Sequence, residues 1–84
     1  LRIQAIRALG LIPTAGAERT LTEVLEKRSL LWAGRLESLR LEAAAALGQM
    51  ATPGAKRALE QCYRHARSAL REACQQALEK ARGR

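Results

Sequence analysis

The sequence lacks several residue types that enzymes and metal sites commonly use. Its 84 residues include no Phe, Asn or Asp, one Trp, one Tyr, one His and two Cys. Without Asp, and with a single His, neither a catalytic triad nor a carboxylate dyad can be assembled convincingly. The two cysteines are too few for a disulfide framework and lack zinc-ligand spacing, so they indicate a reducing compartment. We therefore expect no enzyme activity, no metal and no cofactor.

Long apolar runs are also missing, so no membrane-spanning helix is expected. Ala, Leu, Glu, Arg and Gln dominate, and all of them favour helices. The formal net charge is +7, and residues 56–84 hold eight bases against three acids. Such an asymmetry is typical of an anion-binding surface and equally of a solubility charge in an Arg-rich proteome. The composition favours an all-α protein of the bacterial cytoplasm.

The chain repeats itself at a fixed offset. Residues 1–10 (LRIQAIRALG) return as residues 39–48 (LRLEAAAALG), and the match continues at the same offset to Leu21 and Leu59. A decayed third copy opens at Leu70. Self-similarity at a period of about 20 to 50 residues predicts a stack of helical repeats.

The apolar spacing predicts five helices with short connections, at about residues 1–12, 15–28, 37–50, 53–66 and 68–82. Thr14, Thr52 and Ser68 are expected to cap the second, fourth and fifth helices. Each helix has one apolar stripe, and together the stripes predict the core. The stripes are Leu1, Ala5, Ala8, Leu9 and Ile12; Ala17, Leu21, Val24 and Leu25; Leu39, Ala43, Ala46, Leu47 and Met50; Ala55, Leu59, Cys62 and Tyr63; and Leu70, Cys74, Ala77 and Leu78.

This single domain divides into a half repeat (1–12), a repeat with an inserted loop at 28–36 (15–50) and a C-terminal capping repeat (53–82). The inserted loop carries the apolar triplet Leu30-Leu31-Trp32. The triplet either folds back over the core as a short helical turn or exposes Trp32 as an anchor for a partner, because aromatic anchors dominate many interfaces.

These patterns resemble those of HEAT repeat proteins. The inner-helix pattern L-R-x-x-A-x-x-A-L-G is carried by residues 1–10 and 39–48 and, decayed, by residues 70–79. The outer-helix pattern A-x-x-x-L stands at Ala17-Leu21 and Ala55-Leu59. The resemblance implies a right-handed α–α superhelix of about two and a half repeats, here the C-terminal fragment of a longer protein. It implies little about function, because such repeats serve as scaffolds in unrelated systems.

Family members often place an Asp four residues before the inner-helix Arg, which gives a ladder of Asp–Arg pairs. Those positions hold Leu36 and Arg67 here. Arg2, Arg40 and Arg71 are therefore either tied structurally by Glu37 or Ser68, one residue later, or free to bind a ligand.

From the resemblance we expect a non-catalytic module that binds a partner protein on its inner-helix side. The candidate residues are Arg2, Arg7, Arg40, Glu42, Gln49, Arg71 and Gln75. One alternative is a regulatory extension of an enzyme domain that lies upstream.

Another alternative is a surface that binds a phosphate backbone through basic residues. They are Lys56, Arg57, Arg64, Arg67 and Arg71. Basic side chains that neutralise phosphates give salt-sensitive affinity for nucleic acids. Against this reading, Glu60 is spaced to pair with Arg57 and Arg64 along one helix, and no aromatic residues interleave for base stacking.

The two ends of the stack give separate expectations. The last helix is predicted to cap the stack, with Glu72 and Gln75 in solvent. The first helix is predicted to leave Leu1, Ile3 and Ile6 less covered than Leu39, Leu41 and Ala44, and to mediate self-association. The remaining chemistry is expected to be structural: His65 lies on the surface, and Cys62 and Cys74 pack in the core of one repeat.

Overall fold

The structure, a computed structural model, describes residues 3–26 and 33–83. Within these residues it contains five α-helices and no strand, which confirms the all-α helical repeat fold. The helices are α1 (Ile3–Leu9), α2 (Ala15–Glu26), α3 (Ala33–Met50), α4 (Pro53–His65) and α5 (Ser68–Arg82). Arg2 and the Leu30-Leu31-Trp32 triplet lie outside the described residues.

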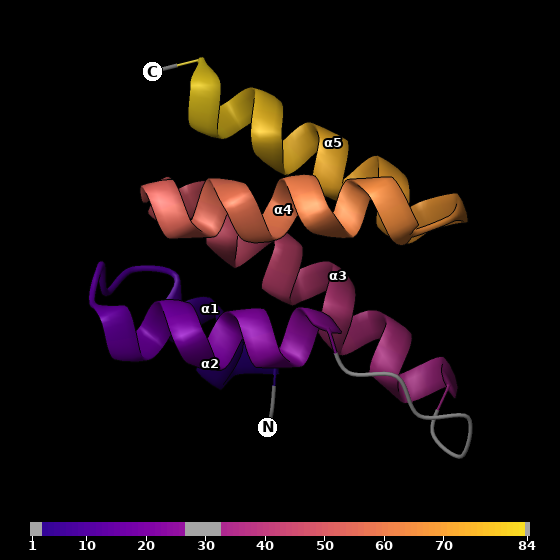
Figure 1. The fold of residues 1–84 in the computed structure, drawn as a ribbon. Coiled ribbons are helices and arrows are strands. Elements are labelled where there is room, and N and C mark those ends of the chain that lie inside the picture. The colour runs from indigo at the N-terminus through magenta and orange to yellow at the C-terminus, as the bar shows by residue number, and fades with distance from the viewer. Residues whose placement is uncertain (1–2, 27–32, 84) are drawn as a thin grey trace.

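The helices form two layers (Figure 1). The inner helices α1, α3 and α5 lie side by side in one layer, and the outer helices α2 and α4 cover it. Helices α2 and α3 form one antiparallel pair, and α4 and α5 form the next. Helix α3 contacts all four of the other helices, so it is the centre of the stack.

Local capping signals explain where α2 and α4 begin. The Thr14 hydroxyl accepts a hydrogen bond from the Ala17 N–H at 3.2 Å, and Thr52 accepts one from Ala55 at 3.1 Å. Pro53 stands in the first turn of α4, where its missing N–H costs nothing. The predicted cap at Ser68 is wrong. Its φ of 55° is left-handed, whereas an N-cap residue needs an extended backbone; the N-cap of α5 is Arg67, without a side-chain cap bond.

Two helices differ in length from the expectation. Helix α1 ends at Leu9 rather than near residue 12, and Leu11 and Ile12 continue it only as turns with bonds to carbonyls three residues earlier. Pro13 follows and disfavours helical backbone at Ile12. Helix α3 begins at Ala33 rather than near residue 37, so the last four residues of the predicted inserted loop are helical.

The core is built from the predicted stripes of the later helices. All four stripe residues of α2 and of α5 are buried, as are Ala43, Ala46, Leu47 and Met50 of α3. Ala55 and Leu59 of α4 are also buried. The expectation that Glu72 and Gln75 are exposed is confirmed.

The prediction for α1 holds only for Leu9, which is half-buried and packs against the core, and the fully buried residue of α1 belongs to the other apolar strip. Ile6 is fully buried, whereas Ala5, Ala8 and Ile12 are exposed. Helix α1 packs against α3, and Ile6 is buried as completely as its repeat equivalent Ala44. Ala8 stands on the opposite side, where the described chain places no further helix.

Glycines let the inner helices approach one another closely. A Cβ built on Gly10 would lie 2.8 Å from the Cβ of Ala46, and one on Gly48 would lie 2.7 Å from the Cβ of Ala77. Both distances are shorter than carbon–carbon van der Waals contact. Gly10, just after α1, and Gly48 of α3 therefore each form a seat for an alanine of the next inner helix, and we call these two contacts the glycine seats.

Candidate functional site

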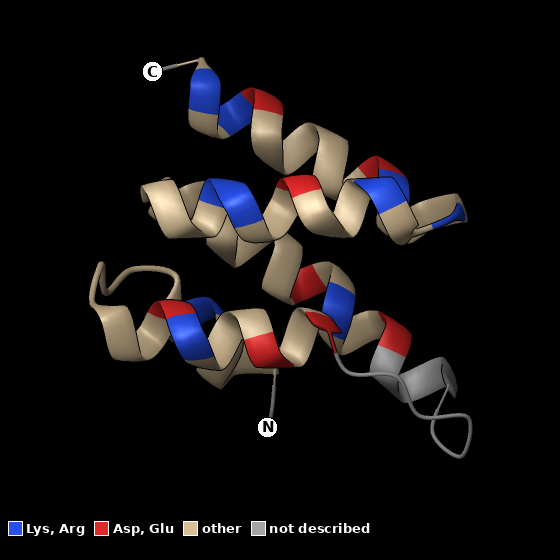
Figure 2. Ribbon diagram, viewed as in Figure 1, with Lys and Arg blue, Asp and Glu red and all other residues tan. Residues whose placement is uncertain are grey.

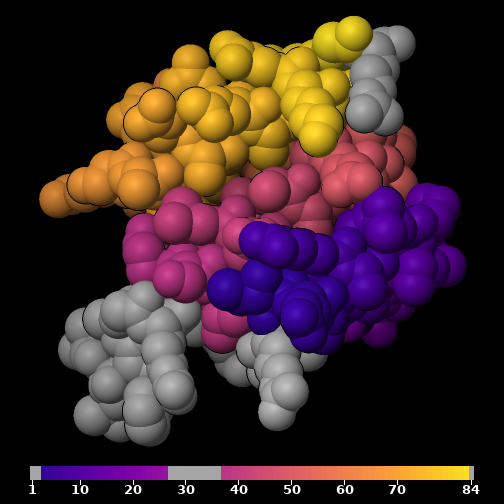
Figure 3. All heavy atoms as spheres, turned by 180° about the vertical axis from the view of Figure 1, so that it is seen from behind, coloured from indigo at the N-terminus to yellow at the C-terminus, as the bar shows by residue number. Residues whose placement is uncertain are grey.

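The inner helices leave one broad face of the molecule uncovered by the outer helices (Figure 3). Repeat register places Arg7, Ala45 and Gln76 at equivalent positions of α1, α3 and α5, and all three are exposed. Gln49 is exposed one turn after Ala45. We call this surface the inner face. Ala45 and Gln76 were missed from the sequence, although the repeat alignment with Arg7 points to both of them.

An ion pair joins α1 to α3 on the inner face. Arg7 Nε donates to Glu42 Oε1 at 2.9 Å, and the second guanidinium nitrogen donates to Oε2 at 3.1 Å. This two-pronged geometry suits a planar guanidinium and a carboxylate. The hydrogen bond from Arg7 holds the pKa of Glu42 below its usual value. The pair is therefore fully charged at neutral pH, and both members stay accessible to a partner.

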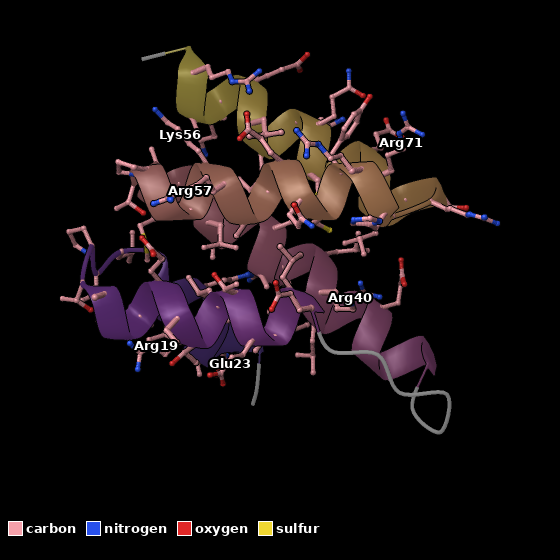
Figure 4. All side chains as sticks on the ribbon, viewed as in Figure 1. Arg19, Glu23, Arg40, Lys56, Arg57 and Arg71 are labelled. Atoms are coloured by element: carbon pink, nitrogen blue, oxygen red, sulfur yellow. The ribbon has the colours of Figure 1, made fainter. Side chains whose placement is uncertain are left out.

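Arg40 and Arg71 each bond to the outer helix of their own pair, although no Asp ladder is present. Arg40 Nε donates to the carbonyl oxygen of Leu25 at 2.8 Å, at the end of α2 (Figure 4). Arg71 donates to the hydroxyl of Tyr63 at 3.3 Å and lies 4.5 Å above the centre of its ring. Tyr63 is the repeat equivalent of Leu25. Each arginine thus ties its inner helix to the end of the outer helix in the same pair.

The remaining candidates for the inner side are dispersed. Gln75 is the repeat equivalent of the buried Ile6 and Ala44, so it faces the end of the stack rather than the inner face. Arg2 and Trp32 lie outside the described residues, and their predicted roles remain predictions.

The basic residues of α4, together with Arg67 just after it, form no ion pair with another described residue. Glu60 binds Arg82 of α5 at 2.6 Å, so among the described residues it pairs with neither Arg57 nor Arg64, contrary to expectation. Arg57, Arg64 and Arg67 are exposed, and Lys56 is half-buried. None of these four has an acidic partner in the part of the chain that is described. Figure 2 shows these bases along α4, interrupted only by Glu60.

A cleft of about 700 Å³ opens where α2 and α4 end and α3 and α5 begin. The first helix pair contributes Glu26, Glu37 and Arg40 to its charged lining, and the second contributes Arg67. The lining residues are Leu25, Glu26, Glu37, Arg40, Gln61, Cys62, His65, Ala66, Arg67 and Leu70. His65 is exposed, as predicted, and its Nε2 lies 3.4 Å from Nε2 of Gln61.

The two cysteines lie on the two helices of one pair, as predicted. Cys74 is fully buried, and Cys62 is half-buried on the wall of the cleft. A hydrogen bond with Cys62 and, next, burial raise the pKa of the Cys74 thiol well above its usual value. Cys74 is therefore a protonated thiol at neutral pH.

The described residues contain neither a metal-binding cluster nor a membrane-spanning helix. No three His, Cys or Glu side chains gather there closely enough to hold a metal ion. The described helices include none that is long and apolar enough to cross a bilayer.

Two stacked helix pairs with repeated caps and repeated glycine seats define a helical repeat protein. The family model described as HEAT repeats matches residues 1–79. The chain therefore belongs to the HEAT repeat family, which confirms the resemblance seen in residues 1–10 and 39–48. No curated protein and no solved structure matches it. HEAT repeats commonly act as protein-interaction scaffolds and are generally non-enzymatic.

Proposed function

We propose that this chain is a non-catalytic module that binds a partner protein through its inner face. The observation that carries the proposal is the composition of that face. It combines an accessible Arg7–Glu42 pair, the small side chain of Ala45 at the centre of the stack, and the amides of Gln49 and Gln76. It is a broad surface that the outer helices do not cover.

The chemistry of the inner face suits a protein partner. Ala45 adds little bulk above α3, so a helix or loop of the partner can approach the layer closely. Arg7 and Glu42 lie to one side and offer charged donors and acceptors, which set the orientation of a partner more than its affinity. Gln49 and Gln76 supply neutral hydrogen-bonding groups. A polar rim around a close-packed centre is the usual anatomy of a protein interface.

Site-specific photo-crosslinking in the cells that make the protein tests this proposal. A photoreactive residue in place of Ala45 is expected to capture a defined protein, identified by mass spectrometry. The matched control carries the same residue in place of Glu23, which is exposed on the outer helix α2. Capture from position 23 alone, or equal capture from both positions, would contradict binding through the inner face.

A second candidate function is the binding of a nucleic-acid backbone through the basic residues of the α4–α5 pair. The specific observation in its favour is the Glu60–Arg82 ion pair. Because Glu60 is occupied by α5, the positive charges of Arg57 and Arg64 are not neutralised along α4. Uncompensated bases on one side of a protein attract phosphates and release counterions when they bind.

The salt dependence of duplex binding tests the second candidate. Fluorescence anisotropy with a labelled DNA duplex should show affinity that falls steeply with salt. Arg57→Gln should reduce the slope of log affinity against log salt concentration by about the amount of one phosphate contact. Arg19→Gln is the matched control, because Arg19 is the exposed repeat equivalent of Arg57 on α2 (Figure 4). Salt-independent binding, or equal losses in both variants, would reject the basic surface.

Three coarser expectations accompany the proposal. The compartment is proposed to be the bacterial cytoplasm, on the composition and the absence of disulfides among the described residues. Self-association through α1 would use the exposed Ala5 and Ala8. A regulatory role beside an enzyme domain is compatible with the same inner face.

A further inference from the structure

The second helix pair contains two thiols in register. Cys62 projects from α4 and packs against the buried core to which Cys74 of α5 belongs. Their repeat equivalents in the first pair are Val24 and Ala43, which are both buried in the same core. Both repeats therefore direct these two positions toward one core, and only the second repeat carries sulfur at them.

The two thiols differ in their access to solvent. Cys74 is fully buried, whereas Cys62 lines the cleft between the helix pairs. The cleft is large enough to admit small molecules. The hydrogen bond with Cys62 raises the pKa of Cys74, in agreement with the packing of both thiols in one core. A reagent that enters the cleft thus meets Cys62 first, with a second thiol directly behind it.

We propose that Cys62 and Cys74 form an oxidation site, at which a small hydroperoxide entering the cleft converts the two thiols into an intramolecular disulfide. This proposal does not depend on the proposed function. Disulfides in reducing compartments are usually transient and redox-sensing, and a solvent-accessible cysteine beside a second cysteine is the common arrangement of such sites.

The reaction balances in two steps. The Cys62 sulfur attacks the peroxide, the O–O bond breaks, and the departing alkoxide takes the Cys62 proton and leaves as an alcohol. The resulting sulfenic acid is then attacked by the Cys74 sulfur. The S–O bond breaks, and the hydroxyl takes the Cys74 proton and leaves as water. The two thiols together lose two electrons and two protons, and the peroxide is reduced to alcohol and water.

Intact-mass measurement after treatment with hydrogen peroxide tests the proposal. The folded chain, treated and then denatured with N-ethylmaleimide, is expected to be lighter by two hydrogens, to take up no maleimide, and to recover both thiols after reduction. The disulfide joins α4 to α5, so the oxidised chain should also melt several degrees higher.

The first repeat supplies the control substitutions. Cys74→Ala and Cys62→Val each introduce the residue that the first repeat has at that position, so both should fold. Cys74→Ala should accumulate a sulfenic acid on Cys62 that dimedone traps. Cys62→Val should resist peroxide, because Cys74 is fully buried and does not line the cleft. Two maleimide adducts on the treated native chain, disulfide-linked dimers in place of the internal bond, or Cys62→Val reacting as fast as the native chain would each overturn the proposal.

Discussion

Replacing Leu47 with alanine is expected to leave most of the chain unfolded. Leu47 is fully buried in α3, the helix that contacts all four others. Truncating leucine in a packed core costs about 2–5 kcal/mol of unfolding free energy. A domain of this size has a total stability near the low end of the usual range, about 5 kcal/mol. The loss therefore approaches the whole stability of the fold.

Thermal unfolding followed by circular dichroism measures this effect, with Leu78→Ala as the matched control. Leu78 is the repeat equivalent of Leu47 and is also buried, but among the described helices α5 packs only on α3 and α4. Because no other described helix packs on α5, α5 can move to fill part of the cavity that Leu78→Ala leaves. The unfolding midpoint of Leu78→Ala should therefore fall less than that of Leu47→Ala. Equal midpoint losses, or a larger loss for Leu78→Ala, would mean that α3 is not the centre of the core.

Replacing Gly48 with alanine is expected to destabilise the chain by about 1–3 kcal/mol, the usual cost of overpacking a core. In an exposed helix the same change stabilises, because glycine costs about 1 kcal/mol relative to alanine. Here the added methyl would lie 2.7 Å from the Cβ and 2.9 Å from the backbone of Ala77. Helix α5 would have to move away from α3, and packing along their whole contact would loosen.

Gly16→Ala is the internal control for this prediction. Gly16 is exposed in α2, and a Cβ built there meets nothing within 4 Å. Its replacement should therefore raise the unfolding free energy by about 0.5–1 kcal/mol. Urea denaturation of both variants gives the two free energies directly. A stabilised Gly48→Ala variant would show that the seat is looser than the structure indicates.

Features that depend on neighbouring residues in the chain were predictable from the sequence. The repeat offset and the apolar spacing place all five helices. Thr14 caps α2 and Thr52 caps α4, each through the N–H of the residue three positions later. The stripes of α2 and α5 are buried as predicted because each has one dominant apolar side. Helix α1 has two apolar sides, so its spacing alone does not say which one the stack covers.

Features that depend on contacts between helices were not predictable. Glu60 has basic residues at favourable spacing on its own helix, yet Arg82 of α5 reaches it instead. The missing Asp ladder left open whether the arginines are tied or free, and Arg40 is tied by a backbone carbonyl that no sequence pattern marks. The predicted helix over residues 37–50 contains Gly48, and no sequence pattern marks the close approach of Ala77 to it.

The glycine seats also give the stack two unlike ends. Glu79 occupies in α5 the position that Gly10 and Gly48 occupy in α1 and α3, and it is exposed. The exposed Ala8 of α1 has the shape that fits a seat, but α5 offers a charged side chain where the seat would be. A second copy therefore cannot dock its α1 on this α5 as closely as α5 docks on α3.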